Sequence, residues 1–250
     1  MIRRDDLHFA GHGGDEVATY FAAPDAGETL PGVVLAHEVF GLDAHVRDVA
    51  CRLAEEGFAV VAPDLYSREG VPGPSSTADD PAPAWTVEEI RAAVAGLPDR
   101  RVVGDLDAAA AWLGERPEVD AERIAALGFC MGGCFAFLLG CASTRVAATV
   151  DFYGRIVYPD LSAEKPVQPL ELALNLGCPL LAFFGEGDAS IPMADVERMR
   201  TVLSQFARNF DIVTYPSAGH GFFNDKKTTF DEAAAADAWR RMLEFLREVM

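Results

Sequence analysis

The sequence lacks any long apolar run. No segment approaches the ~20 consecutive apolar residues that a membrane-spanning helix needs. The opening stretch, MIRRDDLHFAGHGGDE, carries arginines, acids and glycines in place of the apolar core of a secretory signal. We therefore expect a soluble cytoplasmic protein that has no membrane partner.

Basic residues are also scarce. The chain has 21 Lys and Arg against 39 Asp and Glu, a formal net charge of -18 at pH 7. The long-range field of this charge repels phosphate backbones, which argues against a nucleic-acid partner. The same field slows the approach of a small anionic substrate unless a local cationic patch reverses it.

Cysteine is sparse as well, with five residues in a chain of 250. An odd number in a chain of this length does not form the disulfide framework of small secreted proteins, so we expect reduced thiols. Cys130, Cys134 and Cys141 lack the paired C-x-x-C spacing of a zinc site, and they fall on what reads as one helix. We therefore expect neither a metal nor an organic cofactor.

The composition does provide for a large core. Half of the residues are hydrophobic and 24% are charged, and 250 residues suffice for one large domain. Short runs rich in Val, Ile, Leu and Phe recur, with amphipathic helical stretches between most of them. This alternation is typical of a mostly parallel central sheet with helices on both faces. We predict a single α/β domain over residues 1–250.

The alternation can be followed along the whole chain. Segments 7–9 and 17–22 are expected to form an opening antiparallel hairpin. Further strands are expected at 32–36, 58–62, 124–129, 146–152, 179–184 and 210–215, and helices at 43–56, 87–94, 103–113, 134–141, 194–206 and 230–249. Polar excursions interrupt the pattern at 67–84 and 155–171. The first excursion, rich in Pro, Gly and Ser, has a length that is often functional in a compact domain.

A Gly-x-Cys-x-Gly pattern joins one predicted strand to the next helix in GFCMGG. This is the pattern of a nucleophile elbow, with Cys130 in the nucleophile position. Such a turn is so tight that the residues two positions away must lack bulk, as Gly128 and Gly132 do. The following helix points its free N–H groups at the sulfur and favours a thiolate. The alternative is a packed core thiol among glycines that allow close contact between helix and strand.

A nucleophile of this type needs a base and an acid that orients the base, in the chain order nucleophile, acid, histidine. Asp188 follows the predicted strand 179–184 and His220 follows 210–215, so both are expected at the carboxyl edge of the sheet. Taken alone, Asp188 reads as a turn or N-cap aspartate, and His220 as a polar loop residue. Other histidines compete for the base role but follow no late strand: His8, His12, His37 and His45. Order and context together predict a triad of Cys130, Asp188 and His220.

Glu38 lies in AHEVFG, directly after the predicted strand 32–36, and is expected at the same edge. In folds with such an elbow, the backbone after this strand supplies one oxyanion donor, which suggests the N–H of Val39 beside that of Met131. A carboxylate near a thiol can take the thiol proton when a substrate arrives. The alternative is a turn carboxylate bound to backbone or to a nearby arginine, and spacing alone leaves both interpretations open.

The chain resembles the dienelactone hydrolase family of the α/β-hydrolases. The matching stretches, between about residues 30 and 225, are HEVFGLDAHVRDVACRLAEEGFAVVAPDLY, GDLDAAAAWL, GFCMGGCFAF, DFYG, FFGEGDASIP and YPSAGHGFF. The resemblance implies an α/β-hydrolase fold and hydrolysis of a carboxylic ester or lactone through an acyl thioester. It assigns the triad to Cys130, Asp188 and His220. It also implies that Glu38 holds the thiol and then deprotonates it as substrate binds.

The chain departs from the family in its arginines. The family's namesake binds the carboxylate of dienelactone through arginines, one of them a few residues after the histidine. Here that region reads GFFND, and the arginines before GDLDAA have no clear correspondence: Arg91, Arg100 and Arg101. We take Arg91 as a candidate substrate contact. We expect a more apolar acyl pocket lined by Tyr153, Phe222 and Phe223, with ordinary core packing of these aromatics as the alternative.

Two other classes of function stay open. A non-catalytic ligand-binding or thiol-sensing protein could use Cys130 for ligand capture or oxidation, although a sensor thiol needs no ordered triad. An interaction scaffold is the other class. The expected partner is a small ester or lactone substrate, and the expected oligomeric state is a monomer or a homodimer.

Overall fold

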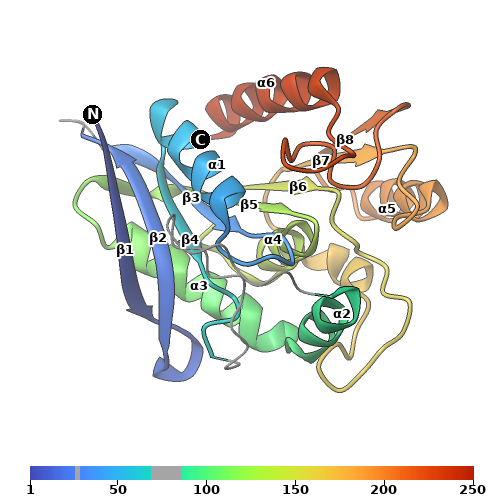
Figure 1. The fold of residues 1–250 in the computed structure, drawn as a ribbon, viewed down its shortest axis with the longest axis horizontal. Coiled ribbons are helices and arrows are strands. Elements are labelled where there is room, and N and C mark those ends of the chain that lie inside the picture. The colour runs from blue at the N-terminus through green and yellow to red at the C-terminus, as the bar shows by residue number, and fades with distance from the viewer. Residues whose placement is uncertain (26–28, 69–85) are drawn as a thin grey trace.

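The structure of the chain is a computed structural model. Its described residues include one eight-stranded sheet with the strand order β1-β2-β4-β3-β5-β6-β7-β8 (Figure 1). The structure describes residues 1–25, 29–68 and 86–250. The strands are β1 (Ile2–Ala10), β2 (Glu16–Pro24), β3 (Leu30–Ala36), β4 (Ala59–Pro63), β5 (Val119–Phe129), β6 (Ala148–Phe152), β7 (Leu180–Gly185) and β8 (Phe210–Tyr215). β2 pairs antiparallel with β1 and with β4, and the other neighbouring strands are parallel.

The parallel strands are apolar along most of their length because both faces of the sheet are covered. β4 and β7 are buried at every residue, as strands between two helical layers should be. The predicted opening hairpin is confirmed, with Phe9 opposite Val17, but its strands are longer than predicted. β1 is an edge strand with many polar, exposed residues, so its outer part carries a weak apolar signal.

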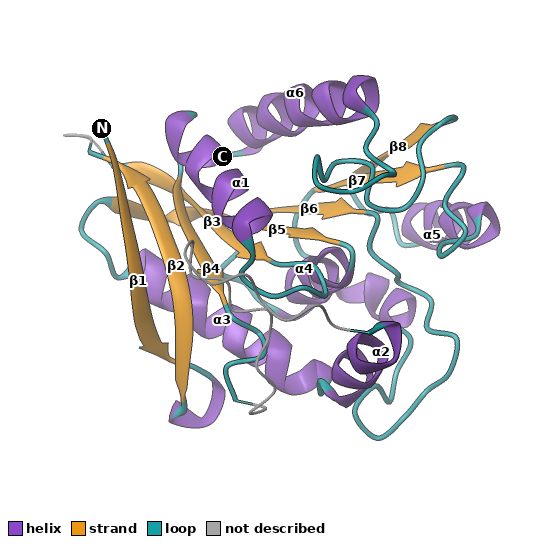
Figure 2. Ribbon diagram, viewed as in Figure 1, coloured by secondary structure: helices purple, strands orange, loops and turns teal. Residues whose placement is uncertain are grey.

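Helices cover both faces of the sheet (Figure 2). They are α1 (Ala44–Glu55), α2 (Val87–Gly96), α3 (Asp99–Gly114), α4 (Met131–Ala142), α5 (Met193–Gln205) and α6 (Glu232–Val249), with short 3-10 helices η1 (His12–Gly14) and η2 (Pro169–Asn175). α1 and α6 share one face, where Arg247 Nη2 donates to Glu56 Oε2 at 2.6 Å. α3 and α4 pack together on the other. The predicted α/β fold is confirmed, and no helix in the described ranges is long and apolar enough to cross a membrane.

Some element boundaries differ from the prediction. α4 begins at Met131 and not at Cys134, because Gly132 and Gly133 read as poor helix formers although close packing requires them here. The excursion 155–171 is mostly irregular, as predicted, and runs into η2. The predicted excursion 67–84 lies outside the described residues from position 69 onward.

Candidate active site

Cys130 occupies the tight turn between β5 and α4. Its backbone has φ 55° and ψ -115°, a conformation that costs a side-chain-bearing residue on the order of 1–3 kcal/mol. A Cβ on Gly128 would lie 2.0 Å from the Gly132 carbonyl oxygen. A Cβ on Gly132 would lie 2.1 Å from the carbonyl oxygen of Ala36 in β3. Glycine is therefore required on both sides of the cysteine, as the elbow pattern predicts.

The structure brings three of the sequence-predicted side chains into one hydrogen-bonded chain. His220 Nε2 lies 3.0 Å from Cys130 Sγ, and His220 Nδ1 lies 2.7 Å from Asp188 Oδ2. These residues follow β8, β5 and β7, which are parallel and end at the same edge of the sheet. Because a carboxylate only accepts hydrogen bonds, His220 Nδ1 carries a proton and Nε2 faces the sulfur.

Asp188 serves two structural purposes at once. Its Oδ1 accepts from the backbone N–H groups of Ser190 at 2.6 Å and Ile191 at 3.1 Å. Its Oδ2 is left for His220. The two interpretations of this aspartate, a turn residue and the partner of the histidine, are therefore both correct as geometry, because each uses a different oxygen.

The environment of His220 favours its protonated form. The pKa of the imidazole is raised from 6.5 to about 10. Burial is the largest single influence and lowers the pKa, but the hydrogen bonds and charges of Asp188 and Cys130 together outweigh it. Tyr153 packs edge-on against the ring at 5.3 Å, and Thr229 Oγ1 donates to the His220 carbonyl at 2.7 Å. The surroundings of His220 therefore fix the orientation of the ring and also favour its positive charge.

Glu38 is buried in the loop after β3, and its carboxylate accepts hydrogen bonds from groups other than the thiol of Cys130. Its Oε1 accepts from Lys227 Nζ at 2.8 Å, and its Oε2 accepts from Asn224 Nδ2 at 2.7 Å. The sulfur of Cys130 faces His220 instead. Sequence reasoning missed Lys227 and Asn224, because polar residues in a loop carry no signal of a carboxylate that lies 189 and 186 positions away along the chain.

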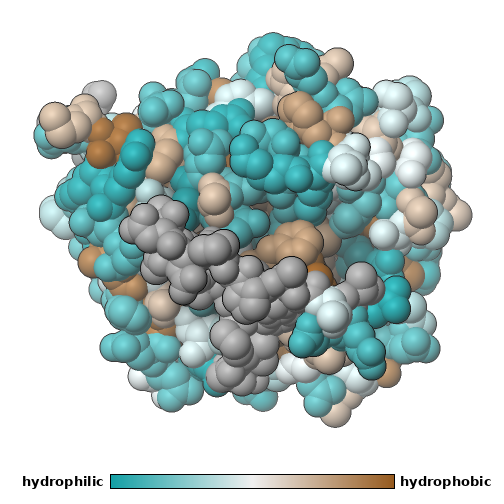
Figure 3. All heavy atoms as spheres, in the orientation of Figure 1, coloured by the Kyte–Doolittle hydropathy of each residue, from teal (hydrophilic) through white to brown (hydrophobic). Residues whose placement is uncertain are grey.

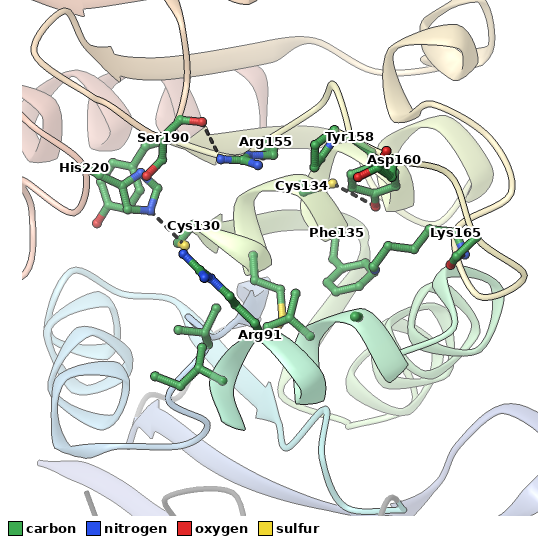
Figure 4. A pocket seen from close by; sticks show the side chains of 18 of the residues that line it. Arg91, Cys130, Cys134, Phe135, Arg155, Tyr158, Asp160, Lys165, Ser190 and His220 are labelled. Carbon is green, nitrogen blue, oxygen red and sulfur yellow. Dashed lines mark hydrogen bonds between the residues drawn. The ribbon is translucent and has the colours of Figure 1, made fainter. Parts of the chain in front are cut away.

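A cavity of about 610 Å³ opens beside Cys130 and His220 (Figure 4). The residues predicted for the oxyanion hole, Val39 and Met131, both line it, as does Tyr153. Val39 belongs to the loop after β3 and Met131 is the first residue of α4, so two separate elements bring backbone to the elbow. Figure 3 shows apolar surface near the centre of this view, with hydrophilic surface above it and to its right.

Basic side chains enter this largely apolar cavity from several elements. Arg91 extends from α2, Arg155 follows β6, and Lys165 lies in the loop before η2 (Figure 4). Lys165 Nζ pairs with Asp99 at 2.9 Å, whereas Arg155 Nη2 donates to the Ser190 carbonyl at 2.5 Å. Sequence reasoning named Arg91 and missed Arg155, which directly follows the DFYG stretch.

The structure places two of the expected pocket residues elsewhere. Phe222 and Phe223 are buried, with 0% and 3% exposed, and neither is among the described residues that line the cavity. Phe223 stacks on Phe129 at 5.1 Å, and Phe222 packs against Tyr153 at 5.2 Å. The prediction of Phe222 and Phe223 as pocket lining is therefore corrected, because both rings pack behind Tyr153 and β5 in the aromatic core.

A mostly parallel sheet with a cysteine elbow after β5, and with its aspartate and histidine after β7 and β8, defines an α/β-hydrolase. The model of the dienelactone hydrolase family matches residues 17–250. The chain belongs to this family.

Individual relatives agree with this assignment. A Salmonella typhimurium protein named "Putative carboxymethylenebutenolidase" is 39% identical over 236 residues, which cover 94% of this chain and 84% of that protein. A Bradyrhizobium protein named "Probable 2-oxo-3-(5-oxofuran-2-ylidene)propanoate lactonase" is 31% identical over 237 residues, which cover 95% of this chain and 91% of that protein. A crystal structure of a "Putative Dienelactone Hydrolase" from Klebsiella pneumoniae matches with a TM-score of 0.90 at 34% identity, covering 99% of each chain. The family resemblance seen in the sequence is confirmed.

Proposed function

We propose that the protein hydrolyses a carboxylic ester or lactone, with Cys130 as nucleophile, His220 as base and Asp188 as the group that orients the base. The observation that carries the proposal is the continuous hydrogen-bonded path from Asp188 through His220 to Cys130, at 2.7 and 3.0 Å, on an elbow turn. Membership of the dienelactone hydrolase family supports the reaction class.

In the first half of the reaction, the sulfur of Cys130 attacks the ester carbonyl while the thiol proton resides on His220 Nε2. The carbonyl π electrons move to its oxygen, and the N–H groups of Val39 and Met131 stabilise this oxyanion. The oxyanion then collapses and the C–O bond breaks. The leaving alkoxide takes the proton from His220, and a thioester remains on Cys130.

In the second half, water replaces the alcohol beside His220. Water gives one proton to Nε2 and its hydroxide adds to the thioester carbonyl. Collapse of the second oxyanion breaks the C–S bond and releases the acid. Asp188 keeps Nδ1 protonated and stabilises the imidazolium in both halves.

Glu38 lies outside this proton path in our proposal. The family resemblance implies that the glutamate deprotonates the thiol, but here both of its oxygens accept hydrogen bonds from Lys227 and Asn224. Taking a proton from Cys130 would first require breaking a buried ion pair, in which the Glu38 side chain is 1% exposed. We therefore assign Glu38 to holding the loop that carries His220 against the loop that carries Val39.

We also infer that the substrate carries an anionic group. Arg91 and Arg155 line the cavity near Cys130 in a chain whose net charge is -18. Asp160 also lines the cavity, so the two guanidinium groups leave a net positive charge on its wall. This charge acts within one Debye length of about 10 Å and can orient a carboxylate. The remaining walls are mostly apolar and suit the body of the ester or lactone.

Turnover of short acyl p-nitrophenyl esters tests the proposal. We expect hydrolysis by the full chain, its loss after alkylation by iodoacetamide, and its loss in Cys130→Ala with the thermal unfolding midpoint retained. Turnover that persists in folded Cys130→Ala would overturn the assignment of the nucleophile. A wild-type protein whose Cys130 is alkylated but which turns over no ester or lactone would support the thiol-sensing alternative.

A further inference from the structure

The imidazole of His37 lies buried beside the peptide that joins Glu38 to Val39. The side chain is 0% exposed. Its Nδ1 lies 2.5 Å from the Glu38 carbonyl oxygen, and its Nε2 lies 3.0 Å from the backbone nitrogen of Leu65. The proposed reaction gives this ring no task, so its buried and fully bonded state needs another explanation.

The backbone partners determine the tautomer of His37. The Leu65 N–H can only donate, so Nε2 accepts and carries no proton. The single ring proton therefore sits on Nδ1 and is donated to the Glu38 carbonyl. Asp64 Oδ1 lies farther from Nε2, at 3.7 Å.

The bond from His37 orients the next N–H group. A trans peptide holds its C=O and the following N–H on opposite sides. The Glu38 carbonyl is held by His37 Nδ1 and also accepts from the Gly41 N–H at 3.3 Å. The Val39 N–H therefore points away from His37, and Val39 lines the cavity together with Cys130.

A second aromatic side chain holds the following peptide. Tyr66 Oη donates to the Val39 carbonyl at 3.0 Å and lies 3.7 Å from Met131 Sδ. Its ring centroid is 5.4 Å from that of His37. The peptides on both sides of Val39 are thus fixed by buried side chains, as a preorganised donor requires.

We propose that His37 is a positioning residue of the oxyanion hole. Its Nδ1–H holds the Glu38–Val39 peptide so that the Val39 N–H is aimed at the developing oxyanion before substrate arrives. The inference rests on the proposed function, because only a reaction that forms an oxyanion needs this N–H. His37 itself exchanges no proton with substrate and forms no covalent bond.

Two substitutions separate the contacts that His37 makes. In His37→Asn, the amide nitrogen takes the place of Nδ1 and can still donate to the Glu38 carbonyl, while the Leu65 bond is lost. In His37→Gln, the amide oxygen takes the place of Nε2 and can accept from Leu65, while the donor to Glu38 is lost. The pair therefore tests the donor separately from the buried bond to Leu65.

Two rates are measured on the full chain of each variant. The first is acylation, measured as the first-turnover release of p-nitrophenolate from p-nitrophenyl acetate. The second is alkylation of Cys130 by iodoacetamide, which needs the nucleophile but displaces iodide without forming an oxyanion. A purely structural disturbance of the elbow would lower both rates.

We expect His37→Gln to lose about 10- to 100-fold in acylation, toward the effect of removing an oxyanion donor, and to be alkylated at the wild-type rate. His37→Asn should recover most of the acylation rate. Wild-type acylation in His37→Gln, a parallel loss of both rates, or an Asn variant as slow as Gln would each overturn the inference. Absence of acylation in a wild type that is readily alkylated would instead overturn the proposed function.

A measurement on the unsubstituted protein covers the case in which His37→Gln does not fold. The ¹⁵N chemical shifts of the imidazole report which ring nitrogen is protonated. We expect the ring proton of His37 to lie on Nδ1 and Nε2 to carry none. A proton on Nε2 would overturn the inference, whichever variants fold.

Discussion

Two cysteines at the start of α4 line the same cavity, Cys130 directly before the helix and Cys134 in its first turn. Each is linked through an aromatic side chain to an aspartate. One set, the histidine chain, is Cys130, His220 and Asp188; the other, the tyrosine chain, is Cys134, Tyr158 and Asp99. In the tyrosine chain, Tyr158 Oη lies 3.4 Å from Cys134 Sγ and 3.1 Å from both carboxylate oxygens of Asp99. The connectivity is the same, but the chemistry differs.

The difference lies in the middle residue and in burial. A tyrosine that donates its proton to Asp99 can only accept from the thiol, and burial followed by the charge of Cys134 raises the pKa of Tyr158 well above its usual range. Burial also raises the pKa of the Cys134 thiol to about 12. Such a thiol stays protonated at neutral pH and is a weak nucleophile. We therefore expect a cysteine in this cavity to be reactive only where it has a base and the strained turn, and not through its position in the cavity alone.

The largest expected effect separates the two cysteines. Cys130→Ala should lower kcat/KM for a p-nitrophenyl ester by roughly 10⁴-fold or more, because removing a nucleophile disables the catalytic unit. Cys134→Ala should change it only a few-fold. A comparable loss in both variants would mean that the tyrosine chain takes part in catalysis.

Substitution of the aspartate should also lower kcat more in the histidine chain than in the tyrosine chain. Asp188→Asn should lower kcat by roughly 10³- to 10⁴-fold, because the amide favours the wrong tautomer of His220. Asp99→Asn should leave kcat near the wild-type value. Steady-state kinetics on both variants give the comparison, and equal kcat values would contradict it.

Lys227 pairs with Glu38 and Lys165 pairs with Asp99, and the two ion pairs should contribute differently to the free energy of unfolding. Lys227→Met should reduce the free energy of unfolding by about 3–5 kcal/mol, because it leaves the buried Glu38 carboxylate without its counter-ion. Lys165→Met should cost less, because Asp99 is 14% exposed, against 1% for Glu38. Urea unfolding measures both. Recovery of stability in Glu38→Gln/Lys227→Met, relative to Lys227→Met, serves as the control.

The guanidinium groups of Arg91 and Arg155, neither of which forms an ion pair among the described residues, should affect substrate binding. Arg155→Ala should raise KM for a carboxylate-bearing ester roughly tenfold, the scale of one hydrogen bond to a charged group. The matched neutral ester should be affected much less. Lys165→Ala, which removes a cation already paired with Asp99, should leave both KM values nearly unchanged. An equal rise in KM for charged and neutral esters would contradict the inferred anionic substrate.

The smallest expected effect is in the pH dependence. Because the pKa of His220 is raised to about 10, kcat/KM should fall on the alkaline side near pH 10 as the imidazolium loses its proton. Asp188→Asn should move this fall to lower pH, since it removes one of the groups that raise the pKa. The raised pKa of His220 also contributes to the stability of the folded state. This contribution is fully present below about pH 6.5 and is lost as the pH rises toward 10. An unmoved alkaline limb in Asp188→Asn would contradict the assignment.

Much of the fold was predictable because its signals are local. Strand and helix periodicity over about ten residues placed most elements, and the glycines around Cys130 mark a turn that no larger residue could make. The positions of Asp188 and His220 at the sheet edge followed from strand order, since parallel strands end on the same side. Their hydrogen bonds, in contrast, depend on the folded arrangement of the loops.

The sequence by itself therefore determined the α/β class, the elbow and the residues able to form a triad, because each depends on short-range pattern and chain order. Only the tertiary structure decided that Lys227 neutralises Glu38, that Arg155 enters the cavity and that Phe222 belongs to the core. An aromatic or charged residue reads the same in a sequence whether it lines a cavity or fills a core. Its role is set by which distant loop it meets at the edge of the sheet, and such long-range contacts leave no local pattern.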